Sequence, residues 1–314
     1  MKTIHVVTGQ TATGKTQFAL NQAARTGGAL INFDARQIYR GLDIVTGKDT
    51  KGAHFSVWNK VNGVTAGFYL MEKGIPLWLY DIIEPGVPFS AFEYEQVALP
   101  VLDHLLKLHD TVYLVGGSYF YLYNLLYQQT LTTAPPDMKL RELLRSRTLE
   151  ELQQLAYTLN EDDFLNLNNS DKMNPRRLIR FIERARLGER HTGSLSFEPV
   201  IHRKLGRKPE ELKLVYTAFR FADTGSLKRR IERRIESRLD EGALSEVQSL
   251  IQSGADFNSP GFNSIGYRQI ATYLSGTATR EWLIREWGTK ERQFAKRQMT
   301  FMRRDPHLIW FTIP

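Results

Sequence analysis

The run from Gly9 to Thr16 combines residue types and a spacing that bind phosphate groups. It reads Gly-Gln-Thr-Ala-Thr-Gly-Lys-Thr and matches the phosphate-loop pattern Gly-x4-Gly-Lys-Ser/Thr. In such a loop, backbone N–H groups converge on one oxyanion, and the following helix points its positive end at the same place. Lys15 adds a point charge there, and the Thr16 hydroxyl is placed to bind a magnesium ion that the phosphates share. We therefore expect Mg2+ as a cofactor, with Thr16 as its protein ligand, and a phosphate-binding set of Gly9, Gln10, Thr11, Ala12, Thr13, Gly14, Lys15 and Thr16.

Further polar residues follow predicted strands, the place where ligands bind in parallel sheets. Asp34 could orient magnesium or accept a proton from a nucleophile, although an aspartate at this place also caps helices, and Gln37 could read a base edge. Asp81 follows four large residues, as in the magnesium-holding strand of phosphate-loop NTPases, and favours a kinase. Ser118, in Gly116-Gly117-Ser118, offers a hydroxyl at the start of a helix. The phosphate loop alone does not decide between these chemistries.

These residues need a sheet that brings the ends of its strands together. Short apolar runs alternate with helical stretches in the first half of the chain, which predicts an α/β fold with a parallel sheet covered by helices. The expected strands are 4–8, 29–33, 77–82, 111–115 and, after a long excursion, 212–219. Asn62-Gly63 between apolar runs at 55–58 and 64–69 predicts a small surface hairpin.

The chain is expected to divide into a core and an inserted lobe. Residues 1–129 would form the first part of a P-loop NTPase-like α/β core, and residues 130–205 an inserted helical lobe that begins at the linker 130–136. Residues 206–314 would return to the core with its last strand and then form basic C-terminal helices. Inside the lobe, Asn174-Pro175 predicts the start of a helix, with Asn as its cap.

The composition restricts the class of protein. The 314 residues include no cysteine, which excludes disulfides and thiolate metal sites. Met1-Lys2 leads into a core strand without a signal peptide, and no apolar run approaches the ~18 residues that a membrane helix needs. We therefore expect a soluble cytoplasmic protein that has no membrane partner. As a separate expectation, the protein is taken to act as a monomer.

Positive charge is concentrated in the second part of the chain. The net charge is +8, and residues 1–135 carry ten Lys/Arg and ten Asp/Glu, whereas residues 171–240 carry nineteen Lys/Arg against ten Asp/Glu. This asymmetry indicates a polyanionic partner such as nucleic acid, with solvated basic helices as the alternative. The run 290–304 mixes basic side chains with Phe294 and Phe301, which suits stacking on unpaired bases but also an ordinary amphipathic helix.

Together these segments resemble the tRNA dimethylallyltransferases, also called tRNA isopentenyltransferases. The phosphate loop is similar to the family's Gly-Pro-Thr-Ala-Ser-Gly-Lys-Thr, and Asp34-Ala35-Arg36-Gln37-Ile38-Tyr39-Arg40-Gly41-Leu42-Asp43-Ile44 to its Asp-Ser-Arg-Gln-Val-Tyr-Arg-Gly-Met-Asp-Ile. Val115-Gly116-Gly117-Ser118 resembles Val-Gly-Gly-Thr, and Asn174-Pro175-Arg176-Arg177-Leu178-Ile179-Arg180 resembles Asn/Asp-Pro-x-Arg-x-x-Arg. The family's late motifs follow in order at 227–234, 264–268 and 295–301.

The resemblance implies a reaction and a role for each of these residues. The family transfers a dimethylallyl group from dimethylallyl diphosphate to N6 of the adenosine immediately 3′ of the anticodon in tRNA, and releases diphosphate. By this resemblance Asp34 would deprotonate N6, Gln37 would help to hold the adenine, and Thr16 with magnesium would stabilise the departing diphosphate. The implied catalytic residues are Asp34, Thr16, Arg230 and Arg234, and the implied tRNA-binding residues are Asp34, Ala35, Arg36, Gln37, Ser118, Arg176, Arg177, Leu178, Ile179 and Arg180.

Some positions depart from the family pattern. Ala35 replaces Ser, Gly47 replaces Ala, Ser118 and Phe301 stand for Thr and Trp, and the hairpin at 55–69 is an addition.

Three other functions remain open: a P-loop small-molecule kinase, an isopentenyltransferase acting on free adenine nucleotides, and a non-catalytic RNA-binding protein that retains an idle loop. The first two leave the lobe and the basic helices unexplained. The third predicts loss of the phosphate-loop lysine or of the aspartate at position 34, and both are present.

Overall fold

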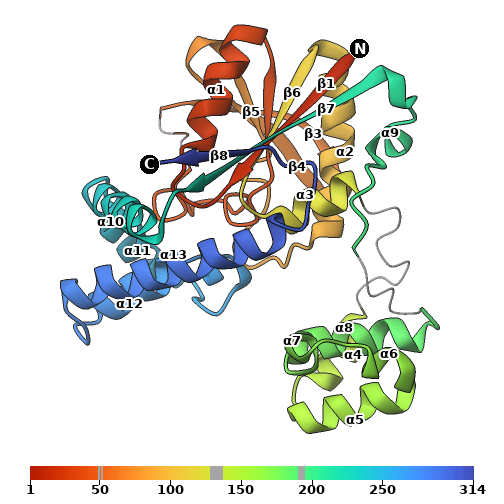
Figure 1. Ribbon diagram of the computed structural model, residues 1–314. Helices are drawn as coiled ribbons and strands as arrows, with labels where there is room; N and C mark the ends of the chain where they lie inside the picture. Colours follow the sequence, from red (N-terminus) through yellow and green to blue (C-terminus); the bar gives the residue numbers. More distant parts are fainter. Residues whose placement is uncertain (49, 51, 128–136, 190–194) are drawn as a thin grey trace. The chain divides into compact units, whose positions relative to one another are not determined.

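The computed structural model describes residues 1–48, 50, 52–127, 137–189 and 195–314 (Figure 1). These residues fall into two compact units, one formed by Met1–Tyr127 with Pro199–Pro314 and the other by Gln128–Glu198. The expected linker at 130–136 lies outside the described residues. None of the helices in the described ranges has both the length and the apolar character needed to cross a membrane.

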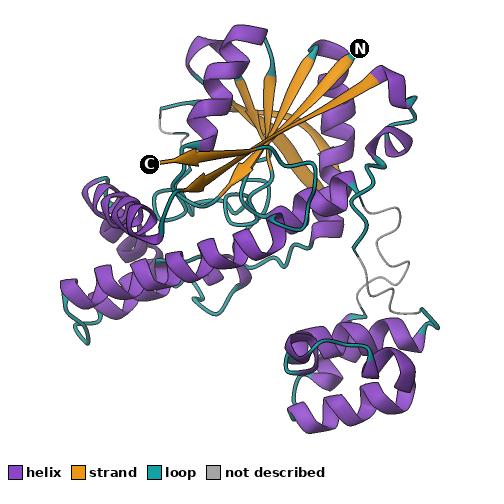
Figure 2. Cartoon of the chain, in the orientation of Figure 1, coloured by secondary structure: helices purple, strands orange, loops and turns teal. Residues whose placement is uncertain are grey.

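An eight-stranded sheet forms the centre of the first unit, in the order β3-β4-β5-β2-β6-β1-β7-β8. Its middle strands run parallel: β1 (Lys2–Gly9), β2 (Ala29–Asn32), β6 (Thr111–Val115) and β7 (Leu212–Phe221). Helices flank these strands (Figure 2): α1 (Lys15–Thr26), α2 (Ala91–Leu108) and α3 (Tyr119–Leu126). Ile4, Val6 and Val7 are fully buried, because a parallel strand covered on both faces needs a continuous apolar run. The α/β fold and these four strands are confirmed.

The Asn62-Gly63 hairpin is confirmed, but it extends the main sheet. β3 (His54–Val61) and β4 (Val64–Leu70) pair antiparallel around a turn in which both residues have positive φ. After η1 (Glu72–Gly74), β4 also pairs with β5 (Pro76–Trp78). The strand expected at 77–82 is therefore shorter than predicted. It ends because the backbone turns: Leu79 and Asp81 take φ values of 64° and 53°.

The C-terminal segment returns to the sheet after a set of helices. α10 (Thr224–Asp240), α11 (Ala243–Gln252), η3 (Pro260–Asn263), α12 (Tyr267–Leu274) and α13 (Arg280–Met302) follow β7 in that order. The α13 helix contacts α10 and α12 from this set, and also α3 and β1. The last strand, β8 (Trp310–Ile313), pairs parallel with β7 and has no counterpart in the sequence prediction.

The second unit is helical, with its own apolar core. It contains α4 (Met138–Leu144), α5 (Leu149–Leu159), α6 (Glu161–Leu165), α7 (Asn169–Lys172) and α8 (Pro175–Arg186). The α8 helix starts as the sequence predicts, because the Asn174 side chain accepts hydrogen bonds from the N–H groups of Arg176 and Arg177. Leu140, Leu152 and Ile182 pack in its core.

The segment 199–205 belongs to the first unit, which corrects the expected lobe boundary at 205. Val200 and Ile201 are buried, and α9 (Ile201–Lys204) ends at a lysine whose Nζ bonds Glu95 Oε1 at 2.7 Å and the Asn124 carbonyl at 2.6 Å. These contacts tie α9 to α2 and α3. A turn, η2 (Pro209–Glu211), then leads into β7.

Candidate active site

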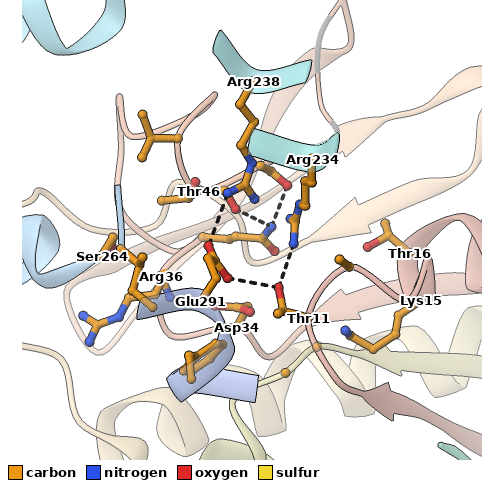
Figure 3. A pocket seen from close by; sticks show the side chains of 18 of the residues that line it. Thr11, Lys15, Thr16, Asp34, Arg36, Thr46, Arg234, Arg238, Ser264 and Glu291 are labelled. Atoms are coloured by element: carbon orange, nitrogen blue, oxygen red, sulfur yellow. Dashed lines mark hydrogen bonds and ion pairs between the residues drawn. The ribbon is translucent and has the colours of Figure 1, made fainter. Parts of the chain in front are cut away.

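A cavity of about 550 Å³ opens at the carboxyl ends of β1, β2 and β6 (Figure 3). Its lining includes many of the residues singled out from the sequence: Thr11, Ala12, Gly14, Lys15, Thr16, Asp34, Arg36, Gln37, Arg230 and Arg234. Their neighbours Gly9, Gln10, Thr13, Ala35 and Ser118 are not among the lining residues. The cavity therefore combines a phosphate loop, a carboxylate and several guanidinium groups.

The phosphate loop is held between β1 and α1 by its glycines. Gly9 has φ +138°, and a Cβ there would lie 2.3 Å from the Phe219 carbonyl oxygen, so only glycine fits. Gly14 adopts a left-handed conformation as the N-cap of α1, whose N-terminus opens on the cavity. The Gln10 side chain points elsewhere, since its Oε1 accepts the Phe221 N–H at 2.8 Å. Gln10 thus supports the loop from β7.

Lys15 lies in the cavity with its Nζ 2.7 Å from the Gln10 carbonyl oxygen. Burial, together with the positive charge of Arg234, lowers the pKa of Lys15 to about 8, although Asp34 and Glu291 oppose the shift. The surroundings of Lys15 therefore disfavour the charged ammonium, and the negative charge of a diphosphate would favour it.

We expect pyrophosphate affinity to fall by about tenfold per pH unit above pH 8. The sign follows from the lowered pKa of Lys15: below about pH 8 the ammonium is charged and attracts the anion, and above it the amine is neutral. Calorimetric titrations from pH 7 to 9.5 at fixed magnesium would measure the slope. Lys15→Arg is the matched control, because a guanidinium stays charged and should flatten the profile. Equal slopes in the two proteins would assign the pH dependence to another group.

Helix α10 brings two arginines to the phosphate loop. Arg234 Nη1 donates to Thr11 Oγ1 at 2.8 Å, and Arg230 Nε donates to the Ala12 carbonyl at 3.3 Å. Both arginines line the cavity. Their placement fits a role on the diphosphate, since guanidinium groups match the geometry of phosphate oxygens.

Asp34 lies in a tight turn after β2. Its Oδ1 accepts the Arg36 N–H at 2.9 Å, so it caps the turn as well as lining the cavity. The Ser118 hydroxyl oxygen accepts the Ala35 N–H at 2.9 Å. The structure therefore gives Ser118 a local partner: it holds the Asp34 turn against the end of β6.

The Gln37 side chain and Arg36 also have protein partners. Gln37 Nε2 donates to the Gly47 carbonyl at 2.8 Å, and Arg36 Nη1 donates to the Pro260 carbonyl at 3.4 Å. Both residues line the cavity. An acceptor base would therefore meet side chains that are already oriented.

Helix α13 contributes charged and polar residues that the sequence analysis missed. Glu291, 7% exposed, lies 3.5 Å from the Arg238 guanidinium, and the Thr11 hydroxyl donates to it at 3.4 Å. A Cβ on Gly47 would lie 2.4 Å from an Arg238 nitrogen, so the glycine that replaces the family's alanine leaves room for this group. In the sequence, the missed residues of α13 are marked only by a polar residue at every third or fourth position of a basic helix. The missed cavity residues include Glu291 and Gln298 on α13 and Arg238 on α10.

Asp81 is not a lining residue of this cavity. Its Oδ1 forms an ion pair with the buried Lys48 ammonium, and its Oδ2 accepts the Tyr69 hydroxyl at 2.7 Å. Lys48 also bonds Asp43 Oδ1 at 2.7 Å. Burial and the Asp81 carboxylate raise the pKa of Tyr69. Both carboxylate oxygens of Asp81 are thus bonded within the protein, so Asp81 no longer supports a kinase function.

Asp81→Asn should destabilise the protein by about 1–3 kcal/mol, because it removes one of the two carboxylates that pair with the buried Lys48 ammonium and leaves only Asp43. Urea unfolding would measure the loss, with Asp110→Asn, which removes an exposed ion pair, as the control. The magnesium concentration that supports half-maximal activity should not change. A variant of unchanged stability that needs much more magnesium would return Asp81 to a metal-binding role.

The basic segment at the start of α8 lies in the second unit. Leu178 is fully buried in the core of that unit, which corrects its assignment as a tRNA-binding side chain, and Ile179 is partly buried against the same core. Leu178 and Ile182, four residues apart, lie on the face of α8 that packs in this core. Arg176 is exposed.

The other arginines of this segment have acidic partners. Arg177 forms an ion pair with Asp171, and Arg180 Nη1 lies 2.9 Å from Glu183 Oε2. Burial alone would raise the pKa of Glu183, but Arg141 and Arg180 outweigh it and hold the pKa below its usual value. Arg180 therefore helps to satisfy a buried carboxylate.

The two phenylalanines of the basic run 290–304 have different surroundings. Phe294 lines the cavity, with the Arg297 guanidinium 5.9 Å from its ring centre. Phe301 packs against Tyr119 and Tyr123, with ring centres 5.7 and 5.8 Å away. Of these two phenylalanines, Phe294 is the one placed to stack on a ligand in the cavity.

Comparisons with known proteins agree along nearly the whole chain. A family model described as IPP transferase matches residues 37–305. The chain is 30% identical over 305 residues to tRNA dimethylallyltransferase 1 of Syntrophus aciditrophicus, covering 97% of this chain and 90% of that protein. It is 32% identical to tRNA dimethylallyltransferase 1 of Hahella chejuensis, covering 95% and 87%. The tRNA isopentenylpyrophosphate transferase of Bacillus halodurans has a similar structure, with a TM-score of 0.63 at 26% identity over 99% of this chain and 89% of that one. A eukaryotic dimethylallyltransferase acting on tRNA shares the fold, with a TM-score of 0.73 at 19% identity over 99% and 74%.

Proposed function

The chain belongs to the IPP transferase family, and we propose that it transfers a dimethylallyl group from dimethylallyl diphosphate to N6 of the adenosine immediately 3′ of the anticodon in tRNA. One observation carries this proposal: Asp34 lines the same cavity as Lys15, Arg234 and the phosphate loop. A base and a diphosphate site in one cavity suit a reaction in which a nucleophile loses a proton while diphosphate departs.

In the proposed reaction step, each of these residues has a defined role. The N6 lone pair forms a bond to C1 of the dimethylallyl group as the C1–O bond breaks, and the electron pair of that bond leaves with diphosphate. Asp34 accepts the proton that N6 loses. The loop N–H groups, Lys15, Arg230 and Arg234 stabilise the charge that develops on the leaving group.

Thr16 is the residue that we propose for magnesium. In the residues that the structure describes, no cluster of three or more His, Cys, Asp or Glu side chains could hold a metal ion. The cavity offers the Thr16 hydroxyl, a hard oxygen ligand of the kind that magnesium uses together with substrate phosphates. Bound there, the ion would neutralise charge on the departing diphosphate.

We propose tRNA, not a free nucleotide, as the acceptor. The cavity mouth carries Arg233 and Arg297 in addition to the arginines on the phosphate loop, and the second unit exposes Arg176. Free adenine nucleotides would need neither. An adenosine in an anticodon loop must leave its stack to enter a recessed site, where Phe294 offers an aromatic face. We also propose that the protein acts as a monomer in the cytoplasm.

A transfer assay would test the proposal. Labelled dimethylallyl diphosphate and magnesium would be mixed with unmodified tRNA, or with AMP or ADP instead, and the labelled product identified. We expect label on the anticodon-loop adenosine only. Label on free nucleotide alone would select the nucleotide prenyltransferase, and phosphoryl transfer from ATP without prenylation would select the kinase.

A further inference from the structure

Gln298 is a buried neutral residue on a helix whose other polar side chains are mostly charged. It is 6% exposed, and both ends of its amide are bonded. Oε1 accepts the Thr11 N–H at 2.9 Å, and Nε2 donates to the Gly117 carbonyl at 3.0 Å. One side chain thus joins the phosphate loop after β1 to the turn after β6.

The chemistry of its partners fixes which way this amide points. A backbone N–H only donates and a backbone carbonyl only accepts, so the oxygen must face Thr11 and the nitrogen must face Gly117. The approach to Gly117 is close, because a Cβ there would lie 2.3 Å from Gln298 Nε2. A glycine at position 117 is therefore a condition for this bridge.

The same face of α13 holds the strand before the loop. Glu291, Ala295, Gln298 and Met302 are buried at helical spacing. Met302 Sδ accepts the Thr8 hydroxyl at 3.4 Å. The Thr11 hydroxyl donates to Glu291 at 3.4 Å. The helix therefore supports the phosphate loop at several points, and Gln298 is the one that continues to the next strand.

From Gly117 the connection reaches the proposed base. The next residue, Ser118, accepts the Ala35 N–H at 2.9 Å, and Ala35 follows Asp34. A chain of hydrogen bonds and one peptide unit thus runs from Thr11 through Gln298 to the Asp34 turn. Its two ends are the site of the departing diphosphate and the site of the proton acceptor.

We infer that Gln298 is a positioning residue, which holds the phosphate loop and the Asp34 turn at the separation that transfer requires. The inference rests on the proposed function. Gln298 carries no charge and uses both ends of its amide within the protein, so it should add little to the binding of either substrate. Its effect should fall on kcat, because displacement of a reacting group by about 1 Å costs on the order of a hundredfold in rate.

The test compares Gln298→Met, which removes both hydrogen bonds, with Gln293→Met on the exposed face of the same helix. We expect Gln298→Met to lower kcat about 10- to 100-fold while each substrate's KM changes less than about threefold. Gln293→Met should match the parent. A role in stability alone would lower Tm and leave the kcat of the folded protein unchanged, and that result would overturn the inference.

A double-mutant cycle identifies the bridge as the cause. Gly117→Ala places a methyl carbon 2.3 Å from Gln298 Nε2, which is too close for both to stay in place, so it should break the same connection and lower kcat similarly. The double variant Gly117→Ala/Gln298→Met should be about as slow as the slower single variant. Rates that multiply would show that the two residues act independently, against the inference.

Hydrogen exchange keeps this result separate from the proposed function. In the parent, the Thr11 and Ala35 amides should both be protected, and Gln298→Met should lower the protection of both about tenfold or more. If Ala35 keeps its protection when Thr11 loses it, the connection does not extend to the Asp34 turn and the inference fails. Absence of transfer in the parent and in Gln293→Met would instead refute the proposed function, whatever the exchange result.

Discussion

Asp34→Asn is expected to lower the rate of prenyl transfer to tRNA about a hundredfold or more, with little change in either KM. Asparagine retains an Oδ1 that can accept the Arg36 N–H, which Asp34 accepts at 2.9 Å, so the turn should persist. What it loses is the ability to take a proton from N6. Single-turnover transfer of labelled donor to unmodified tRNA would measure the chemical step, and thermal unfolding would confirm that the fold is intact.

Asp256→Asn is the matched control for this variant. Asp256 accepts the Asn258 N–H at 2.9 Å in the same local arrangement, and it does not line the cavity. The control should keep the parental rate. An Asp34→Asn protein as fast as the parent would reduce Asp34 to a turn-capping residue, and the proton acceptor would have to be sought elsewhere in the cavity.

The residues that the sequence could predict are those with a local pattern. The phosphate loop has a fixed spacing, and Asp34 follows an apolar run that forms β2. Strand ends in a parallel sheet meet at one edge, so the amino-acid sequence alone is enough to place these two features together. The start of α8 was likewise predictable, because Asn174-Pro175 is a local capping signal.

The features that were missed or mistaken depend on contacts between distant segments. Glu291 and Gln298 are buried because α13 returns to the phosphate loop, about 280 residues away along the chain. Asp81 resembled a metal ligand because its surroundings in sequence are apolar, but Lys48 and Tyr69 arrive from other segments and use both its oxygens. β8 is four residues long and depends on pairing with β7, so its own sequence carries little signal.

The buried polar side chains also show why a basic composition was an incomplete guide. Arg238 was one of many basic residues on α10, yet its side chain is buried beside Glu291 and the Trp287 ring. Arg180 forms an ion pair with the buried Glu183 carboxylate in the second unit. Net charge therefore overestimates the groups that are available to nucleic acid, and the exposed arginines must be distinguished from those that hold the fold.

Lys15→Ala should lower kcat/KM for dimethylallyl diphosphate about 100- to 1000-fold, the effect expected when one preorganised group on a developing anion is removed. Binding of tRNA, measured without donor, should be nearly unchanged, because the basic surface outside the phosphate loop remains. Tm should not fall much either: burial lowers the pKa of Lys15 to about 8, so folding does not favour its charged form. A loss of activity without a loss of stability is the signature of a charge kept for the ligand. Lys107→Ala, which removes an exposed ion pair on α2, is the control and should leave all three quantities unchanged. Unchanged turnover in Lys15→Ala would separate the phosphate loop from the chemistry and leave its sequence pattern without a catalytic explanation.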